Sequence, residues 1–187
     1  MDEDECQRVY LDAIQLSVND KQKLGLSDKY IYQSIENAGL TLEKVKEGVD
    51  QLLQNHPENL QEGTVEALLC LIRIVDPPPD YPLILAKLLL STNHQRHEDI
   101  AHTLQGFKDL RTVDALFQAA LVIHDHLHYD EFFGLARKCT WALADIGTPE
   151  ALSKLQLLAK GENQLIAGYA QKRIDSWKSE RHRKAHK

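Results

Sequence analysis

Two matching segments decide the fold: HEDIAHTLQGFKDLRTVDALFQAAL at residues 97–121 and LARKCTWALADIGTPEALSKLQLLA at residues 135–159. A constant offset of 36 residues aligns apolar with apolar and acidic with acidic positions. The aligned pairs are Phe107 with Leu143, Asp109 with Asp145, Leu110 with Ile146, Thr112 with Thr148, Asp114 with Glu150, Ala115 with Ala151 and Leu116 with Leu152. A repeat period in the thirties is typical of solenoids built from helix pairs.

Each segment predicts two helices, because its apolar residues recur at helical spacing on both sides of a break. In the first segment these residues are Ile100, Leu104 and Phe107, then Val113, Leu116, Phe117, Ala120 and Leu121. In the second segment they are Ala136, Cys139, Leu143 and Ile146, then Leu152, Leu155 and Ala159. We therefore expect these positions to face the core.

The break in the second segment carries the residues that end one helix and begin the next. Gly147 suits the left-handed residue that closes a helix, because it has no Cβ. Thr148 can accept a hydrogen bond from an amide of the next helix as its N-cap. Pro149 then occupies the first helical position, and Glu150 faces the positive end of the helix dipole.

The break in the first segment keeps most of this chemistry. Thr112 and Asp114 take the places of the cap and of the acid, whereas Arg111 replaces the glycine. The two breaks therefore match in polar residues as well as in hydrophobicity, which favours two equivalent helix pairs.

The residues WALADIGTPEAL at 141–152 resemble the HEAT-like repeats first described in phycobilisome lyases. The resemblance covers residues 95–177 well, residues 61–90 loosely and the first sixty hardly at all. It implies an all-α fold, a right-handed α-α superhelix of antiparallel helix pairs. It implies no particular function, because such repeats occur in binding scaffolds and in enzymes.

The sequence predicts three parts: a divergent N-terminal helical cap at 1–60, HEAT-like repeats at 61–177, and a basic flexible tail at 178–187. Within the first part, we expect a helix at 4–18, a second between a cap at Ser27 or Asp28 and Gly39, and a third from Thr41 to the stop at His56. Further helices are expected at 62–75, 83–90 and 162–177. The N-terminal helical cap at 1–60 is expected to cover the apolar end face of the solenoid.

Composition limits the classes of function. The 187 residues are 43% hydrophobic and 27% charged, as in folded domains rather than disordered chains. The net charge of −6 argues against a general nucleic-acid binder. No apolar run approaches the roughly 20 residues of a membrane span, and the acidic start does not resemble a signal peptide. Three scattered cysteines (Cys6, Cys70 and Cys139) predict a protein of the reducing cytoplasm without structural disulfides.

Two catalytic patterns can be compared with the start of the first segment. The helical zinc motif of metalloproteases needs two histidines four residues apart, whereas His97 and His102 are five apart. The residues RHEDIAHTL at 96–104 resemble one repeat of deoxyhypusine hydroxylase, a HEAT-like di-iron enzyme. That family needs several His-Glu pairs, and the second segment begins with Leu135 and Ala136, whereas the first begins with His97 and Glu98. The sequence therefore predicts no catalytic residues and no cofactor.

A histidine-rich insertion follows the first segment. His94 and His97 on one side, and His124, His126 and His128 on the other, bracket one helix pair and could meet in space, where imidazoles can bind zinc or nickel. The alternative is a solvated loop beside polar residues at a helix start. Cys139 lies on an apolar helix face, where packing is the expected role.

The preferred interpretation is a non-catalytic scaffold that binds another protein. The chain resembles small bacterial HEAT-like proteins, some of which are immunity proteins encoded beside toxins, and its negative charge suits a basic toxin. The expected partner-binding residues are His94, His97, Glu98, Asp99, Tyr129, Asp130, Glu131 and Trp141. For Trp141, packing between repeats is the alternative. Other functions left open are a bilin-lyase-like protein and a metal-dependent HEAT-repeat enzyme.

Overall fold

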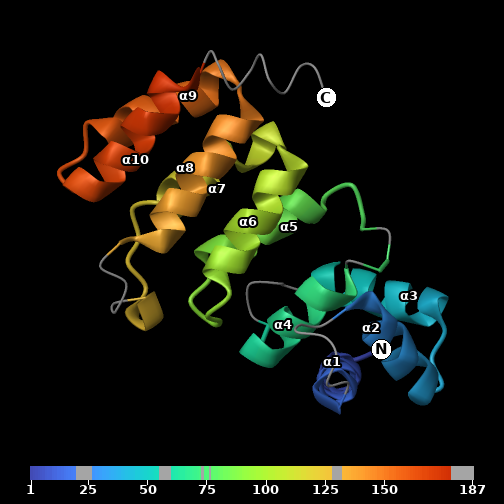
Figure 1. Ribbon diagram of the computed structural model, residues 1–187. Coiled ribbons are helices and arrows are strands. Elements are labelled where there is room, and N and C mark those ends of the chain that lie inside the picture. Colours follow the sequence, from blue (N-terminus) through green and yellow to red (C-terminus); the bar gives the residue numbers. More distant parts are fainter. Residues whose placement is uncertain (20–26, 55–59, 73, 76, 128–131, 178–187) are drawn as a thin grey trace. The chain divides into compact units, whose positions relative to one another are not determined.

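Helices alone make up the regular structure in the part of the chain that the computed structural model describes (Figure 1). The described residues are 1–19, 27–54, 60–72, 74–75, 77–127 and 132–177. The prediction of an all-α protein is confirmed over these residues. None of the helices in these ranges is both long enough and apolar enough to cross a membrane.

The chain divides into two compact units, Met1–Tyr81 and Pro82–Lys187. The first unit contains α1 (Glu3–Asn19), α2 (Asp28–Asn37), α3 (Leu42–Gln54) and α4 (Glu62–Leu71). The second contains nearly all of α5 (Tyr81–Leu90), then α6 (His97–Phe107), η2 (Leu110–Thr112), α7 (Val113–Ala119), η3 (Asp125–Leu127), α8 (Gly134–Ile146), α9 (Pro149–Ala159) and α10 (Gln164–Asp175).

Helix α1 organises the first unit, because it packs against both α2 and α4. Its buried side chains follow helical spacing at Cys6, Val9 and Ala13. The hydroxyl of Thr64 on α4 accepts a hydrogen bond from the Gln7 amide and donates one to the Glu3 carboxylate, each at 2.8 Å. These bonds join α4 to α1 within the first compact unit. The boundary between a cap at 1–60 and repeats at 61–177 stays a prediction.

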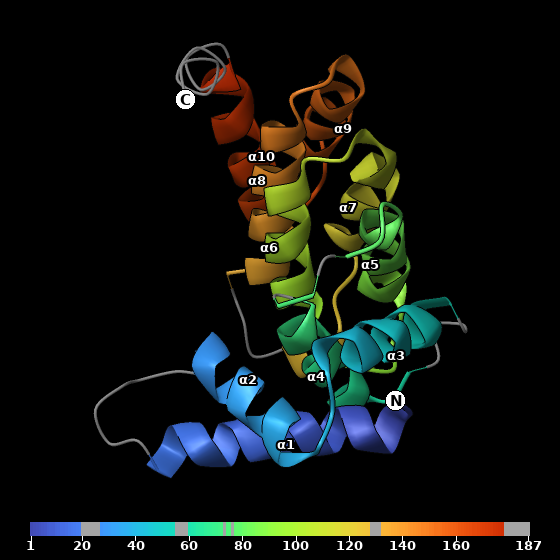
Figure 2. The same cartoon turned by 90° about the vertical axis from the view of Figure 1, so that its right-hand side faces the viewer.

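The helices of the second unit lie in two layers (Figure 2). Helices α6, α8 and α10 pack side by side in one layer, and α7 packs against α9 in the other. Helix α8 is central, because it contacts α6, α7, α9 and α10. Fully buried residues on these helices include Ile100, Leu104, Leu116, Cys139, Leu143, Leu155 and Ala170. The apolar periodicity of the two segments predicted all of these except Ala170, but it missed the buried Leu158 and assigned the exposed Phe107 and Leu121 to the core.

The turn between α8 and α9 has the predicted chemistry. Gly147 adopts a left-handed conformation with φ of 71°, and its amide bonds the carbonyl of Leu143. The Thr148 hydroxyl accepts a hydrogen bond from the Ala151 amide at 3.2 Å, and Pro149 is the first helical residue. The local sequence is therefore sufficient to define this turn.

The turn between α6 and α7 differs from the predicted one. The left-handed residue is Lys108, with φ of 54°. Thr112 precedes α7 as predicted, but its side chain makes no capping hydrogen bond, because its hydroxyl donates to the Asp109 carbonyl. Asp109 explains the change, because its carboxylate accepts hydrogen bonds from both the amide and the guanidinium of Arg111 and stabilises the short helix η2. Helix α6 therefore ends at Phe107, which is exposed, although the aligned Leu143 is buried.

Replacing Thr148 with alanine is expected to lower the free energy of unfolding by about 1 kcal/mol, because the Ala151 amide loses its acceptor. Urea unfolding followed by tryptophan fluorescence measures this loss in the second unit, where both tryptophans, Trp141 and Trp177, lie. Ser153→Ala is a matched control on the same helix, because this hydroxyl donates to the Pro149 carbonyl and caps nothing. Its expected cost is within about 0.5 kcal/mol, and equal losses in both variants would contradict the capping role.

Candidate functional site

The start of α6 and the segment that follows α7 come together at one edge of the second unit, which we call the loop edge and define as residues 91–97 and 121–127. An imidazole from each segment takes part in the contact between them: the ring centroids of His97 and His124 are 3.6 Å apart. Three consecutive aliphatic residues, Leu121, Val122 and Ile123, are exposed there, at 55%, 47% and 54% of their surfaces. The loop edge therefore combines a histidine cluster with an apolar surface.

His94 is a structural residue of this edge. Its Nε2 donates to the carbonyl of Leu88 at 2.8 Å, and its Nδ1 accepts a hydrogen bond from the Arg96 amide at 3.0 Å. Both ring nitrogens are therefore occupied in the neutral tautomer that these bonds select. The ring is buried and stacks on His97 with centroids 4.4 Å apart.

His97 is the first residue of α6 and is fully buried. Its Nε2 lies 2.7 Å from the carbonyl of Ser91, which makes this nitrogen the donor and leaves the lone pair on Nδ1. Nδ1 is buried and has no hydrogen-bond partner among the described residues. The Ser91 carbonyl thus fixes both the tautomer and the direction of the imidazole.

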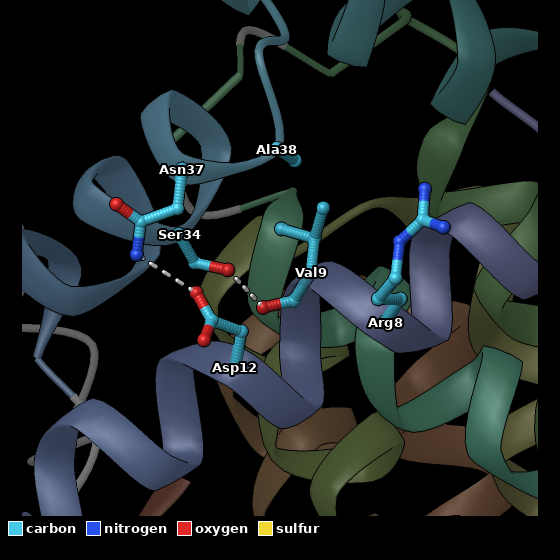
Figure 3. Close-up of a pocket in the computed structure, with 6 residues that line it drawn as sticks. All are labelled: Arg8, Val9, Asp12, Ser34, Asn37 and Ala38. Carbon is cyan, nitrogen blue, oxygen red and sulfur yellow. Dashed lines mark hydrogen bonds between the residues drawn. The ribbon is translucent and has the colours of Figure 1, made fainter.

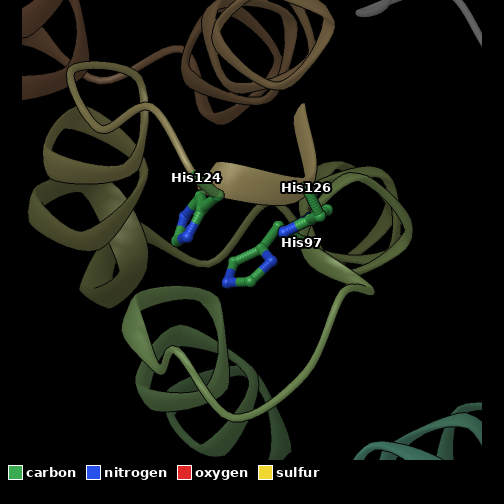
Figure 4. A group of neighbouring side chains, drawn as sticks. All are labelled: His97, His124 and His126. Atoms are coloured by element: carbon green, nitrogen blue, oxygen red, sulfur yellow. The ribbon is translucent and has the colours of Figure 1, made fainter. Parts of the chain in front are cut away.

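His124 and His126 bring two further imidazoles to His97 (Figure 4). His124 is buried, and His126 is half-buried in the helical turn η3. The rings of His97 and His126 have centroids 5.1 Å apart, and one ligand nitrogen from each of the three residues lies within 4.8 Å of the other two. Nε2 of His126 is also buried without a hydrogen-bond partner among the described residues.

The environment keeps His97 neutral at physiological pH. Burial lowers the pKa of His97 from 6.5 to about 4, against the opposing effect of the Ser91 carbonyl, and the neighbouring His94, His124 and His126 lower it further. A neutral imidazole has a lone pair on one ring nitrogen, and it is this neutral form that binds a metal ion.

The acidic residues expected at the partner surface are partly engaged with the chain itself. The Glu98 carboxylate is 3.3 Å from Nζ of Lys138 on α8, and both side chains are half-buried. The carboxylate of Asp99 is exposed and lies 3.6 Å from the Arg96 guanidinium. Asp99 is therefore the more accessible of the two acids.

Trp141 lies on the seam between α8 and α10. The guanidinium carbon of Arg173 is 3.6 Å from the centroid of the indole ring, in a cation–π contact. Arg173 is buried, whereas Trp141 remains 38% exposed. One face of the tryptophan therefore contacts the neighbouring helix, and its role in binding a partner stays a prediction for the exposed part.

The expected contacts at His94 and His97 need correction, because both side chains are buried and present no surface to a partner. Tyr129, Asp130 and Glu131 lie outside the described residues. Of the two alternatives for the histidines of the insertion, the solvated loop does not hold for His124, which is buried against His97. The prediction that Leu121 faces the core is wrong, because Leu121, Val122 and Ile123 are all about half exposed.

Cys139 has the packing role that the sequence predicted. It is fully buried, and burial raises its pKa to about 12, with a further contribution from Glu98. The thiol therefore stays protonated, which makes it a poor nucleophile and a poor metal ligand.

A separate cavity of about 450 Å³ lies in the first unit between α1 and α2 (Figure 3). Its lining is mixed polar and apolar, and in it Asn37 donates to Asp12 at 3.1 Å and the Ser34 hydroxyl donates to the Val9 carbonyl at 2.6 Å. Arg8 lies at the same cavity. This lining differs from the deep apolar groove that a bilin requires.

Comparisons with protein-family models, with curated proteins and with solved structures found no match. The function must therefore be inferred from the two features of the loop edge.

Proposed function

We propose that this protein is a non-catalytic scaffold of the immunity, inhibitor or adaptor type, which binds another protein at the loop edge. In this proposal the second unit is a right-handed solenoid of HEAT-like repeats. The two-layer packing of α6, α8 and α10 against α7 and α9 supports the solenoid. When helix pairs stack as repeats, equivalent helices of successive pairs lie in the same layer.

The exposed aliphatic run Leu121–Ile123 carries the proposal. Contiguous apolar surface is costly to leave in water, and where it occurs it commonly marks a site of protein interaction. Three adjacent side chains, each about half exposed, form such a surface beside the buried histidines. The contact between the rings of His97 and His124 joins this segment to the start of α6.

The expected chemistry of the partner follows from the net charge of the chain, which is −6. A partner with an apolar patch surrounded by basic residues would complement this edge, and opposite potentials would speed the association. A basic toxin domain fits that description.

Leu121→Asp is expected to weaken the complex at least ten-fold, because it places a charge within the apolar contact. The test captures a partner from the native host with the intact chain, and then measures the dissociation constant with that purified partner. Leu157→Asp is the matched control, since Leu157 on α9 is 53% exposed and Leu121 is 55% exposed. An unchanged affinity for Leu121→Asp, or equal losses for both variants, would overturn binding at the loop edge.

A metal-dependent enzyme is the second candidate, and the three converging imidazoles favour it. The two candidates differ in their dependence on His126. An enzyme would lose turnover with His126→Gln, whereas the scaffold would retain its partner in that variant. Native capture that recovers no partner, together with metal-dependent turnover, would favour the enzyme.

A further inference from the structure

We propose that His97, His124 and His126 bind one divalent transition-metal ion, zinc in the first instance, which links the start of α6 to η3. The inference does not depend on protein binding, because it rests only on the geometry of the three imidazoles. It assigns a metal site to histidines for which the sequence left metal binding and a solvated loop as alternatives.

The spacing of the three ligand nitrogens suits one ion. Zinc holds imidazole nitrogens at about 2.0–2.1 Å, so in a tetrahedral site any two of them are about 3.3–3.4 Å apart. The nitrogens of His97, His124 and His126 lie within 4.8 Å of one another. The widest pair must therefore close by at most about 1.4 Å, which rotation of one of these side chains can supply.

Two buried imidazole nitrogens of the cluster have lone pairs that an ion could accept. Nδ1 of His97 and Nε2 of His126 have no hydrogen-bond partner among the described residues. A buried polar atom without a partner is costly, and such atoms in folded proteins often indicate an ion or a water. One metal ion between the rings would satisfy both lone pairs at once.

The Ser91 carbonyl supports His97 as a metal ligand by accepting a hydrogen bond from its other ring nitrogen. Histidine ligands usually donate their other ring N–H to a carbonyl or a carboxylate, which fixes the tautomer and strengthens the ligand. The bond from Nε2 of His97 to Ser91 at 2.7 Å has this form and directs Nδ1 away from the carbonyl. His94 is not a fourth ligand, because both of its nitrogens are already bonded.

The ligand chemistry selects the metal class. Three neutral imidazoles suit zinc, nickel or copper, whereas calcium and magnesium prefer oxygen ligands. Zinc accepts a tetrahedral site with three protein ligands and one exchangeable position. The partial exposure of His126 would leave that position accessible from its side of the cluster.

The test titrates Zn²⁺ into the chelator-treated full chain by calorimetry. We expect one ion per chain, and a dissociation constant at least about 100-fold weaker for His126→Gln and for His97→Gln, because each removes one of three ligands. In His97→Gln the amide can still donate to Ser91, and His126 is only half-buried, so circular dichroism should show both variants folded. Cobalt replacing zinc should give the visible absorption of a tetrahedral site.

Two controls separate this site from adventitious binding by other histidines. His102→Gln removes an exposed imidazole from the same helix, and a variant with both His182→Gln and His186→Gln removes those of the C-terminal tail. Both should bind zinc as the native chain does. The proposal is overturned by an absence of binding at millimolar zinc, by native affinity in His126→Gln, or by loss of binding in the tail variant.

Discussion

Acidification from pH 7 to pH 4 in a chelating buffer is expected to remove roughly 3 kcal/mol from the free energy of unfolding through His97 alone. The pKa of His97 is about 4 in the folded chain and 6.5 for an exposed histidine. Between these values the unfolded chain binds a proton that the folded chain excludes. The stabilisation is therefore complete above pH 6.5 and is lost as the pH falls towards 4.

Urea unfolding at several pH values, followed by the fluorescence of the two tryptophans in the second unit, measures this effect. Carboxylates also titrate in this range, so the difference between the native chain and His97→Gln isolates the contribution of His97. The variant should show a shallower dependence on pH. Leu143→Ala, which lowers stability without removing an imidazole, should keep the native slope. Identical slopes for the native chain and His97→Gln would contradict the burial of an uncharged histidine.

Leu143→Ala is expected to destabilise the second unit by about 2–5 kcal/mol. Leu143 is fully buried on α8, the helix that contacts α6, α7, α9 and α10. Removing its isobutyl group loses burial of apolar surface and leaves a cavity that four surrounding helices cannot easily close. The loss is a large part of the stability of an ordinary domain.

Leu157→Ala provides the comparison for this prediction, because Leu157 lies in the same unit and is about half exposed. Its expected cost is below about 1 kcal/mol. Tryptophan fluorescence should report both losses in the second unit. A cost below 1 kcal/mol for Leu143→Ala would show that α8 is not the central helix of this unit.

The features that the sequence predicted correctly depend on neighbouring residues. Gly147 and Thr148 determine their turn through one backbone conformation and one hydrogen bond, both set within a few residues. The turn after α6 was predicted less well, because the pairing of Asp109 with Arg111 competes with the expected cap. A side chain that binds its own backbone can thus change a turn while the apolar pattern stays the same.

The candidate site could be predicted only in part. The sequence suggested that histidines from two segments could meet, and the contact of His97 with His124 confirms that they do. It gave no indication that carbonyls six residues earlier, at Leu88 and Ser91, would accept hydrogen bonds from His94 and His97. Those bonds depend on the path of the chain between α5 and α6, which hydrophobic periodicity does not specify.

Hydrogen–deuterium exchange of the complex with the captured partner tests binding at the loop edge most directly. If the partner binds at the loop edge, amide exchange should slow in peptides that cover residues 121–127. It should change little in peptides from α9, where Leu157 is a similarly exposed leucine. Protection confined to α9 or to the first unit, with unchanged exchange at residues 121–127, would contradict it.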